Sequence, residues 1–173
     1  MTIPESFQSA RLRAERLTPE HLPEIIRMHQ NPEVMAYLGG LRDDGRSKEY
    51  LEKNLLHWAA FGFGLWIVYE AKGTRPVGRG LLRHLTVDGV DEIETGYAFY
   101  PEVWGRGYAT EIATACIDLA RRHLTVSSIV ALTRPDNHGS QRVLQKSGMT
   151  LDREILHEGT AHLLFRTGVF APP

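Results

Sequence analysis

The 173-residue sequence contains one cysteine, Cys116, which limits the metal and redox chemistry open to it. A single cysteine excludes a disulfide within the chain and a metal cluster built on cysteines. The eight histidines include no H-x-x-x-H pair on a plausible helix, so we expect no metal site. Cys116 falls on the apolar face of a predicted helix, where a core residue is favoured over a reactive thiol.

Long apolar stretches and a strong net charge are also missing. No window approaches the ~18 apolar residues of a membrane span, and the first residues lack the apolar stretch of a signal peptide. The formal net charge is −1, so no basic field attracts nucleic acid or an acidic membrane. We therefore expect a cytoplasmic protein with neither nucleic-acid nor membrane partners.

The composition is that of an ordinary globular protein. Hydrophobic residues make up 42% of the chain and charged residues 24%. A chain of this length buries enough surface for one core, and the sequence contains no linker, internal repeat or low-complexity tract. We predict a single domain over residues 1–173.

The most informative stretch runs from Glu94 to Glu111 and has the sequence ETGYAFYPEVWGRGYATE. The pattern predicts a strand over 94–100, a turn opened by Pro101, and a glycine-punctuated loop that leads directly into a helix. Glycine lets backbone amides approach a ligand, and a helix start leaves N–H groups unpaired at the positive end of its dipole. The junction is therefore either a seat for phosphate or a plain structural turn.

Two common phosphate-binding motifs do not fit this junction. The dinucleotide fingerprint G-x-G-x-x-G fails because Thr110 stands in the position of its last glycine, and the downstream acid is missing. The P-loop fails because the sequence has no Gly-Lys-Ser/Thr.

Helical and strand patterns alternate along the rest of the chain. Helices are predicted over 18–30, 33–38, 47–60, 109–122 and 137–146. Ser47 is the expected cap of the third helix, with Leu51, Leu55, Trp58 and Ala59 as its buried stripe.

Strands are predicted over 10–14, 65–71, 77–85, 92–100, 128–133, 149–154 and 161–169. Asp88-Gly89 is a hairpin signal, and strand 128–133 must lie parallel to strand 94–100 because a helix crosses between them. The sum is an α/β fold, with a mixed, mostly antiparallel sheet of about six to seven strands and helices on both faces.

The glycine-rich junction resembles that of the GCN5-related N-acetyltransferase (GNAT) family, whose signature is Q/R-x-x-G-x-G/A. Gly107 and Ala109 occupy the two small-residue positions, whereas Trp104 stands in the Gln/Arg position, which is a departure. The longer run GYAFYPEVWGRGYATE is similar to the RimJ/RimL-type branch. Residues 137–149, NHGSQRVLQKSGM, resemble the branch pattern N-x-x-S-x-x-V-L-x-K-x-G-F, with Met149 in place of the usual aromatic residue.

The resemblance covers nearly the whole chain and implies the GNAT fold, in which the parallel strand pair splays apart at the cofactor site. It also implies acetyl-coenzyme A (acetyl-CoA) as co-substrate, with no metal. Loop amides would cradle the pyrophosphate, and the strand near its end would pair with the pantetheine amides. The cofactor-binding residues that follow are Phe99, Tyr100, Trp104, Gly105, Arg106, Gly107, Tyr108, Ala109, Thr110, Asn137, Ser140, Arg142 and Lys146.

Some of these assignments have a plain alternative. Arg106 can reach phosphate or can simply be solvated. Asn137 can hydrogen-bond the pantetheine arm, cap a helix, or do both. Arg142 and Lys146 are candidates for the adenosine 3′-phosphate, and otherwise lie in solvent.

Glu94 is the leading candidate for the catalytic base. A lysine amine has a pKa near ~10.4 and an α-amine near ~8, so a base or a water relay must remove a proton before attack. The branch often carries Glu at this position, and Glu94 would act through water unless the amine comes within ~3 Å. The alternative is a solvated carboxylate beside Asp91 and Glu92, which together with Glu94 would attract a cationic amine.

Ser140 matches the position from which a hydroxyl can face the coenzyme sulfur and donate a proton. The alternative is a surface serine in the first turn of a helix. Many relatives place a tyrosine acid five residues further along, but Gln145 cannot act as an acid here. His84 and His138 can line the site or lie at the surface.

The resemblance implies a primary amine as acceptor, either a protein N-terminus, with ribosomal proteins as the precedent, or a small molecule. The amine would lie between the first two helices, strand 92–100 and the C-terminal hairpin, facing the connection 35–48. Two other classes remain open, a CoA-binding regulatory module without turnover and a nucleotide-binding protein of different fold. The protein is expected to be a monomer or a homodimer.

Overall fold

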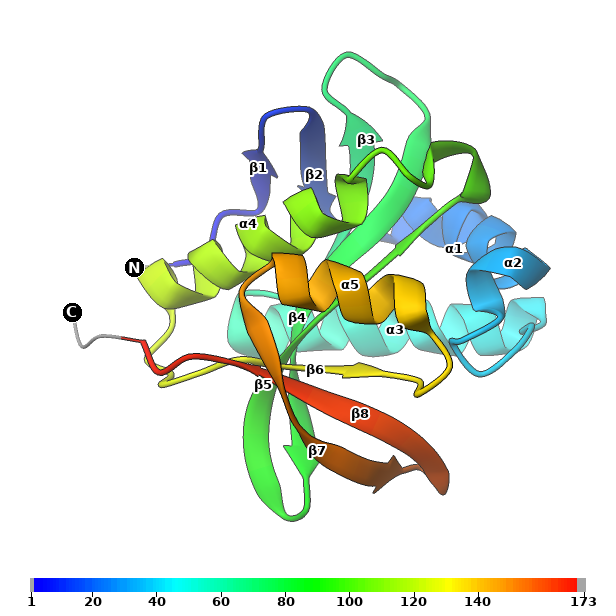
Figure 1. Ribbon diagram of the computed structural model, residues 1–173. Coiled ribbons are helices and arrows are strands. Elements are labelled where there is room, and N and C mark those ends of the chain that lie inside the picture. Colours follow the sequence, from blue (N-terminus) through cyan, green and yellow to red (C-terminus); the bar gives the residue numbers. More distant parts are fainter. Residues whose placement is uncertain (1, 171–173) are drawn as a thin grey trace.

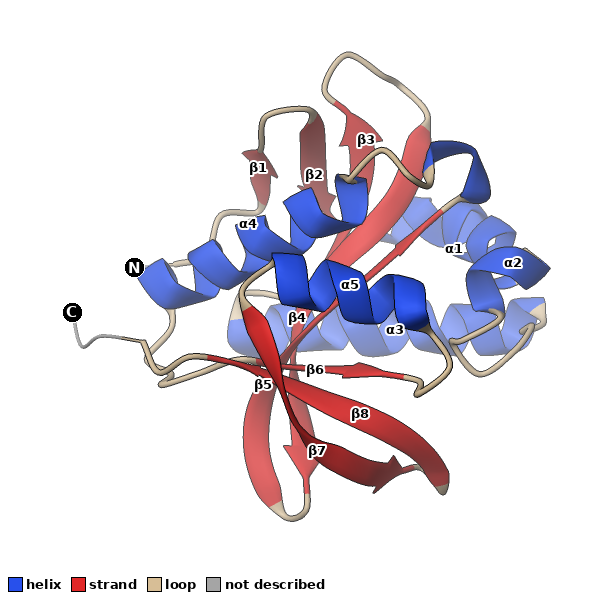
Figure 2. Cartoon of the chain, in the orientation of Figure 1, coloured by secondary structure: helices blue, strands red, loops and turns tan. Residues whose placement is uncertain are grey.

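The computed structural model describes residues 2–170, and its centre is one sheet of eight strands (Figures 1 and 2). The strands are β1 (Ser6–Gln8), β2 (Leu12–Arg16), β3 (Leu65–Glu70), β4 (Pro76–Val87), β5 (Val90–Phe99), β6 (Val130–Thr133), β7 (Met149–His157) and β8 (Thr160–Thr167). Their order in space is β1-β2-β3-β4-β5-β6-β8-β7. Each neighbouring pair is antiparallel except β5–β6, as the crossing helix predicted. The sheet has more strands than the six to seven expected.

Helices cover both faces of this sheet. They are α1 (Leu22–His29), α2 (Pro32–Met35), α3 (Asp44–Phe61), α4 (Tyr108–His123) and α5 (His138–Lys146), with short 3-10 turns at Pro19–His21 and Pro101–Val103. In Figure 1, α4 and α5 lie in front of the sheet, and α1, α2 and α3 lie behind it. No helix among residues 2–170 is long and apolar enough to cross a membrane.

The packing of α4 explains why β4 carries a small residue at its centre. A side chain on Gly80 would meet Ile112 at 2.8 Å, so the helix approaches the strand too closely for any Cβ. Cys116, one turn further along α4, is fully buried, and burial raises the pKa of its thiol to about 12. This position agrees with the core role expected for Cys116.

The first third of the chain departs from its sequence-based prediction in three details. Ser6–Gln8 forms an extra edge strand where loose residues were expected. Asp43, not Ser47, caps α3, because its carboxylate accepts the N–H of Arg46 at 2.8 Å. Ser47 is instead buried and shares a 3.0 Å hydrogen bond with His29, while Ala59 is exposed. The predicted helix therefore began about one turn too late, because the prediction placed the cap at Ser47 in place of Asp43.

The hairpin between β4 and β5 has the predicted two-residue turn. Asp88 and Gly89 both have left-handed backbones, with φ of 50° and 78°. This pair of positive values is the requirement of a type I′ turn, which matches the twist of the flanking strands. The turn fixes the register, so that Arg83 lies opposite Glu94 and Arg79 opposite Ala98.

Candidate active site

The parallel pairing of β5 with β6 is limited to one position, Glu94 opposite Val130. Beyond it, β5 continues to Phe99 while the two strands part. Tyr100 donates its N–H to Val77 of β4 at 3.0 Å. Because bonding direction alternates along a strand, the peptide groups of Tyr97 and Phe99 face the gap between the parted strands. An extended, amide-bearing ligand arm can pair with them there.

The expectation that Tyr100 offers backbone groups to such an arm needs adjustment. Its N–H is used by β4, and its carbonyl oxygen accepts the N–H of Val103 at 3.1 Å. The Phe99 carbonyl accepts the indole N–H of Trp104 at 2.8 Å. The predicted pairing therefore moves one residue back along β5, to the N–H of Phe99 and the peptide groups of Tyr97.

The glycine loop presents free amides at the start of α4. Gly105 and Gly107 both have left-handed backbones, with φ of 76° and 81°, and Gly107 is the residue before the helix. Within residues 2–170 no side chain caps this helix start. The N–H groups of the first turn, Tyr108 to Thr110, have no partner within the helix and lie at the positive end of its dipole. This geometry suits an anion such as a diphosphate.

Arg11, which sequence reasoning missed, holds this loop from behind. Its Nε lies 2.8 Å from Glu111 Oε2, and its Nη1 donates to the carbonyl of Arg106 at 2.7 Å. Its guanidinium lies 5.0 Å from the centre of the Tyr108 ring. Burial tends to raise the pKa of Glu111, but hydrogen bonds from Ser9 and Arg11 outweigh it and lower that pKa. The alternating charge pattern of residues 10–14 predicted a strand with Arg11 exposed, but it could not predict the contact of Arg11 with the loop.

Other loop side chains point away from the helix start. Arg106 contacts Glu70 at 3.2 Å and the carbonyl of Glu102 at 3.3 Å. The Tyr108 hydroxyl also donates to Glu70, at 2.7 Å. An open cavity of about 410 Å³ beside α4 is lined by Ser9, Arg11, Gly107, Thr110, Glu111, Thr114, Ala115 and Asp118. None of these lining residues belongs to β5, β6 or α5, so this cavity is separate from the strand gap.

Asn137 is the cap residue of α5, and Ser140 lies in the first turn of that helix. Asn137 Oδ1 accepts the N–H of Ser140 at 3.1 Å, so the capping role is present in the structure. The Ser140 hydroxyl is 2.8 Å from the hydroxyl of Tyr97, on β5. Burial raises the pKa of Tyr97 to about 12, although the bond to Ser140 opposes the shift. Tyr97 was missed as a site residue. The alternation of side chains along β5 could have indicated it, because Tyr97 points to the face opposite that of Glu94.

The outer face of α5 carries the two basic candidates for the 3′-phosphate. Arg142 and Lys146 are both exposed, one turn apart, and neither has a carboxylate within ion-pair distance in the described part of the chain. His138 lies in the first turn of α5, and His84 is exposed beside Phe61, with ring centres 4.3 Å apart. Among the described residues no group of His, Cys, Asp and Glu is arranged to hold a metal ion.

Glu94 is buried and paired rather than solvated. It is 6% exposed, and its Oε2 lies 2.6 Å from Nε of Arg83. The charge of Glu94, the largest influence, raises the pKa of that guanidinium. The second oxygen, Oε1, has no hydrogen-bond partner among residues 2–170, which leaves it available to an amine or a water.

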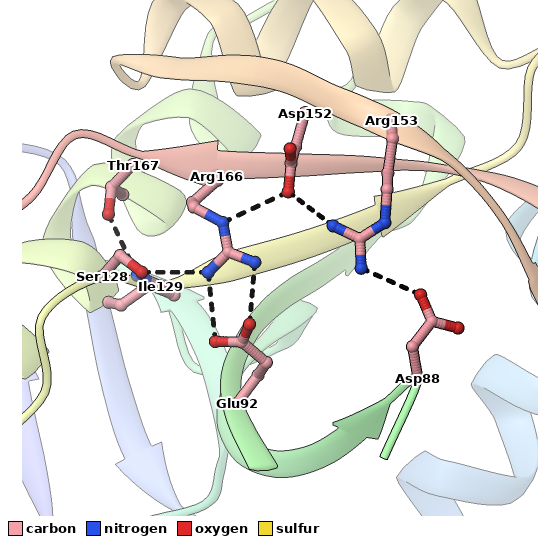
Figure 3. Close-up of polar contacts among 8 residues, drawn as sticks. All are labelled: Asp88, Glu92, Ser128, Ile129, Asp152, Arg153, Arg166 and Thr167. Carbon is pink, nitrogen blue, oxygen red and sulfur yellow. Dashed lines mark hydrogen bonds and ion pairs between the residues drawn. The ribbon is translucent and has the colours of Figure 1, made fainter. Parts of the chain in front are cut away.

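The acidic patch predicted around Glu94 does not form. Figure 3 shows Glu92 held by Arg166, whose Nη2 and Nη1 lie 2.7 and 3.1 Å from its two oxygens. Arg166 also contacts Asp152 at 3.3 Å, which links β5 to β8 and β7. Asp91 accepts the hydroxyl of Thr86 at 3.0 Å. With Glu92 and Glu94 each paired with an arginine, two of the three acids have little charge left to attract a cationic amine, which argues against the expected attraction.

A mixed sheet whose single parallel pair parts beside an uncapped, glycine-led helix start is the arrangement that the resemblance to coenzyme A-dependent acyltransferases implied. Residues 11–150 match the family described as Acetyltransferase (GNAT) domain. The chain therefore belongs to the GNAT family of acetyl-CoA-dependent N-acetyltransferases, and the nucleotide-binding alternative of different fold is excluded.

Individual relatives agree with this assignment. The chain is 30% identical to Bacillus subtilis protein YkkB over 128 residues, 74% of either chain. It is similar to the crystal structure of an acetyltransferase from Agrobacterium tumefaciens, with 25% identity, a TM-score of 0.83, and coverage of 96% and 95% of the two chains. RimL, a ribosomal L7/L12 α-N-protein acetyltransferase solved with coenzyme A, shares the fold at 15% identity and a TM-score of 0.77, over 99% and 100% of the chains.

Proposed function

We propose that the protein transfers an acetyl group from acetyl-CoA to a primary amine by direct attack of the amine on the thioester. The observation that carries the proposal is the parting of β5 from β6 at Glu94, which is the residue best placed to receive a proton. Bound acetyl-CoA supplies the acyl group and a thiolate leaving group. The remaining chemistry is positioning and proton movement by the chain, and positioning alone lowers such barriers by several kcal/mol.

The residues present fit the cofactor at three places. The free amides of Tyr108, Ala109 and Thr110 suit the pyrophosphate, with Gly105 and Gly107 keeping side chains away from it. The N–H of Phe99 and the peptide groups of Tyr97 suit the pantetheine amides. Exposed Arg142 and Lys146 suit the 3′-phosphate. Asn137 remains a candidate for the pantetheine arm alongside its capping role.

Glu94 is the proposed base, acting on the amine through Oε1 and an intervening water. The Arg83 contact fixes the carboxylate on the side of the sheet covered by α1 and α3, because opposite residues in a sheet point to one face. That is the side away from α4, so the amine and the cofactor reach the gap from opposite faces. Attack forms the N–C bond as the C–S bond breaks, and the amine proton passes to Glu94.

Ser140 is the proposed donor to the departing sulfur, with Tyr97 behind it. The hydroxyls lie 2.8 Å apart, so a proton given up by Ser140 can be replaced from Tyr97. Burial keeps Tyr97 protonated at neutral pH. The help required is modest, because a thiol of pKa about 8.5 leaves readily on its own.

The acceptor is a protein N-terminus or a small amine. RimL is the precedent for an N-terminus by its name, but it shares only the fold at this identity. A panel of short peptides beginning with Ala or Ser, together with small amines, tests the class through release of free thiol from acetyl-CoA. Saturable binding of acetyl-CoA without thiol release for any amine would instead favour the regulatory CoA-binding module.

A further inference from the structure

A group of arginines lies beside Glu94 on the face of the sheet covered by α1 and α3. On β4, Arg79 lies opposite Ala98 and Arg83 lies opposite Glu94 of β5. Side chains of opposite residues point to the same face of a sheet, and Ala98 and Glu94 share one face of β5, so both arginines lie on the face of Glu94. Arg42, from the connection between α2 and α3, converges on the same place. The guanidinium carbons of Arg42 and Arg79 lie 5.2 and 5.7 Å from the ring centre of Tyr50, on α3.

The charge of this group is not balanced by the protein. Within the described residues, neither Arg42 nor Arg79 has a carboxylate within ion-pair distance, and Arg42 donates only to the carbonyl of Leu38, at 3.3 Å. The nearby acids at the start of α3 are used elsewhere, since Asp43 caps the helix and Asp44 accepts from Gln30 at 2.7 Å. The group therefore keeps a net positive charge even after Glu94 has neutralised Arg83.

Two buried polar atoms in this group have no partner. Arg79 is 7% exposed, and its Nε forms no hydrogen bond in the part of the chain described; the same holds for the buried hydroxyl of Tyr50. Leaving a buried donor unpaired costs about 1–3 kcal/mol, and more when the group is charged. Such a cost is offset when a ligand supplies the missing acceptor.

His29 reports the same positive potential. Its ring lies 4.7 Å from that of Tyr50, and burial together with the charges of Arg42, Arg79 and Arg46 lowers its pKa to about 4. The histidine is therefore neutral at physiological pH and leaves the charge of the group unchanged. A site with two unpaired guanidinium groups and a phenol favours an anion with several acceptor oxygens.

We propose that the acceptor is a small amine that also carries a carboxylate or a phosphate, held by Arg42, Arg79 and Tyr50 while its amine reaches Glu94. This inference rests on the proposed acetyl transfer and narrows its substrate class. The arginines bind the acceptor and take no part in the exchange of the N–C and C–S bonds. Carboxylate and phosphate share the chemistry that a guanidinium fork recognises, and a matched panel separates them.

The test compares amines that differ only in the anionic group, by thiol release from acetyl-CoA. Serine and O-phosphoethanolamine are each paired with ethanolamine, and phenylalanine with phenethylamine. We expect at least about tenfold higher kcat/KM for an anionic member, and loss of that preference through KM in Arg42→Gln and Arg79→Gln. Lys53→Gln, which removes an exposed positive charge from the same helix as Tyr50, is the matched control and should keep the preference.

A preference for the amine that lacks the anionic group would overturn the inference while leaving acetyl transfer intact. A preference for the anionic amine that both arginine variants retain would do the same. Arg42 is half-buried in a connection, so Arg42→Gln remains informative where Arg79→Gln fails to fold. Should no amine react at all, the proposed function fails, and the anion site is then tested separately by binding of an anion alone. Succinate or inorganic phosphate should then raise the melting temperature of the wild type but not of Arg42→Gln; equal shifts in both would reject the site.

Discussion

Arg83 and Glu94 form an ion pair across the β4–β5 ladder, 2.6 Å from Nε to Oε2, at the one position where the described β5 and β6 pair as strands. The pair fixes one carboxylate oxygen and leaves the other available. It also means that the proposed base does not lie in open solvent, although the sequence around it is acidic. The consequences for turnover can be measured directly.

Glu94→Gln should lower kcat by about 100-fold, because the amide keeps the shape of the side chain but cannot accept a proton. Binding of acetyl-CoA, measured by calorimetry, should change less than about twofold. Glu92→Gln is the matched control, since the Glu92 carboxylate is held by Arg166 and should not affect kcat. Unchanged rates for Glu94→Gln across the pH range would remove it as the base.

Gly107→Ala should weaken acetyl-CoA binding about tenfold. The substitution strains a left-handed backbone, and its Cβ also meets Nη2 of Arg11 at 3.3 Å, so it disturbs the residue that holds the loop. Gly105→Ala carries similar backbone strain, but in the described structure its Cβ meets no atom within 4 Å. Calorimetry should therefore show a smaller loss for Gly105→Ala, and equal losses would argue against a role for the Arg11 contact.

Tyr97→Phe and Ser140→Ala should each reduce kcat about tenfold if the two hydroxyls relay a proton to the leaving sulfur. Since the pKa of Tyr97 is raised to about 12, the wild-type rate should show no alkaline decline from this group between about pH 7 and 10. The pH profile of kcat for both variants provides the check. Full activity in Tyr97→Phe with loss in Ser140→Ala would leave Ser140 acting alone.

His29 should make the protein less stable in mild acid. Its folded pKa of about 4 lies below its ordinary value of 6.5, so between these values the unfolded chain binds a proton that the folded chain does not. The free energy of unfolding should thus fall by up to about 2 kcal/mol between about pH 7 and 5, at ~1.4 kcal/mol per pKa unit. Urea titrations at both pH values should show a smaller fall for His29→Gln.

Local patterns predicted much of the fold. The glycine junction and the Asp88-Gly89 turn are each encoded by residues close together in sequence, and the parallel pair follows from the helix between its two strands. The turn also determines the contact between Arg83 and Glu94, because a two-residue hairpin at 88 and 89 sets the strand register and places residue 83 opposite residue 94. Counting back along the ladder from the turn would have identified the partner of the proposed base.

Contacts between distant elements could not be predicted in the same way. Arg42 and Arg79 meet around Tyr50 only because α3 packs behind β4, and no spacing in the sequence encodes that approach. Arg166 reaches Glu92 because β8 lies between β6 and β7, an order that adjacency along the chain does not suggest. The pairing of Glu92 was missed for this reason, since its partner comes from a distant strand of the packed sheet.

The burial of Cys116 has a practical benefit for every measurement of turnover. This sulfur is enclosed by the core and stays in its thiol form at ordinary pH, so the native protein should be silent toward aromatic disulfide reagents. Colour developed with such a reagent then counts coenzyme molecules alone, and the enzyme can be followed continuously at high concentration without a blank for its own side chains.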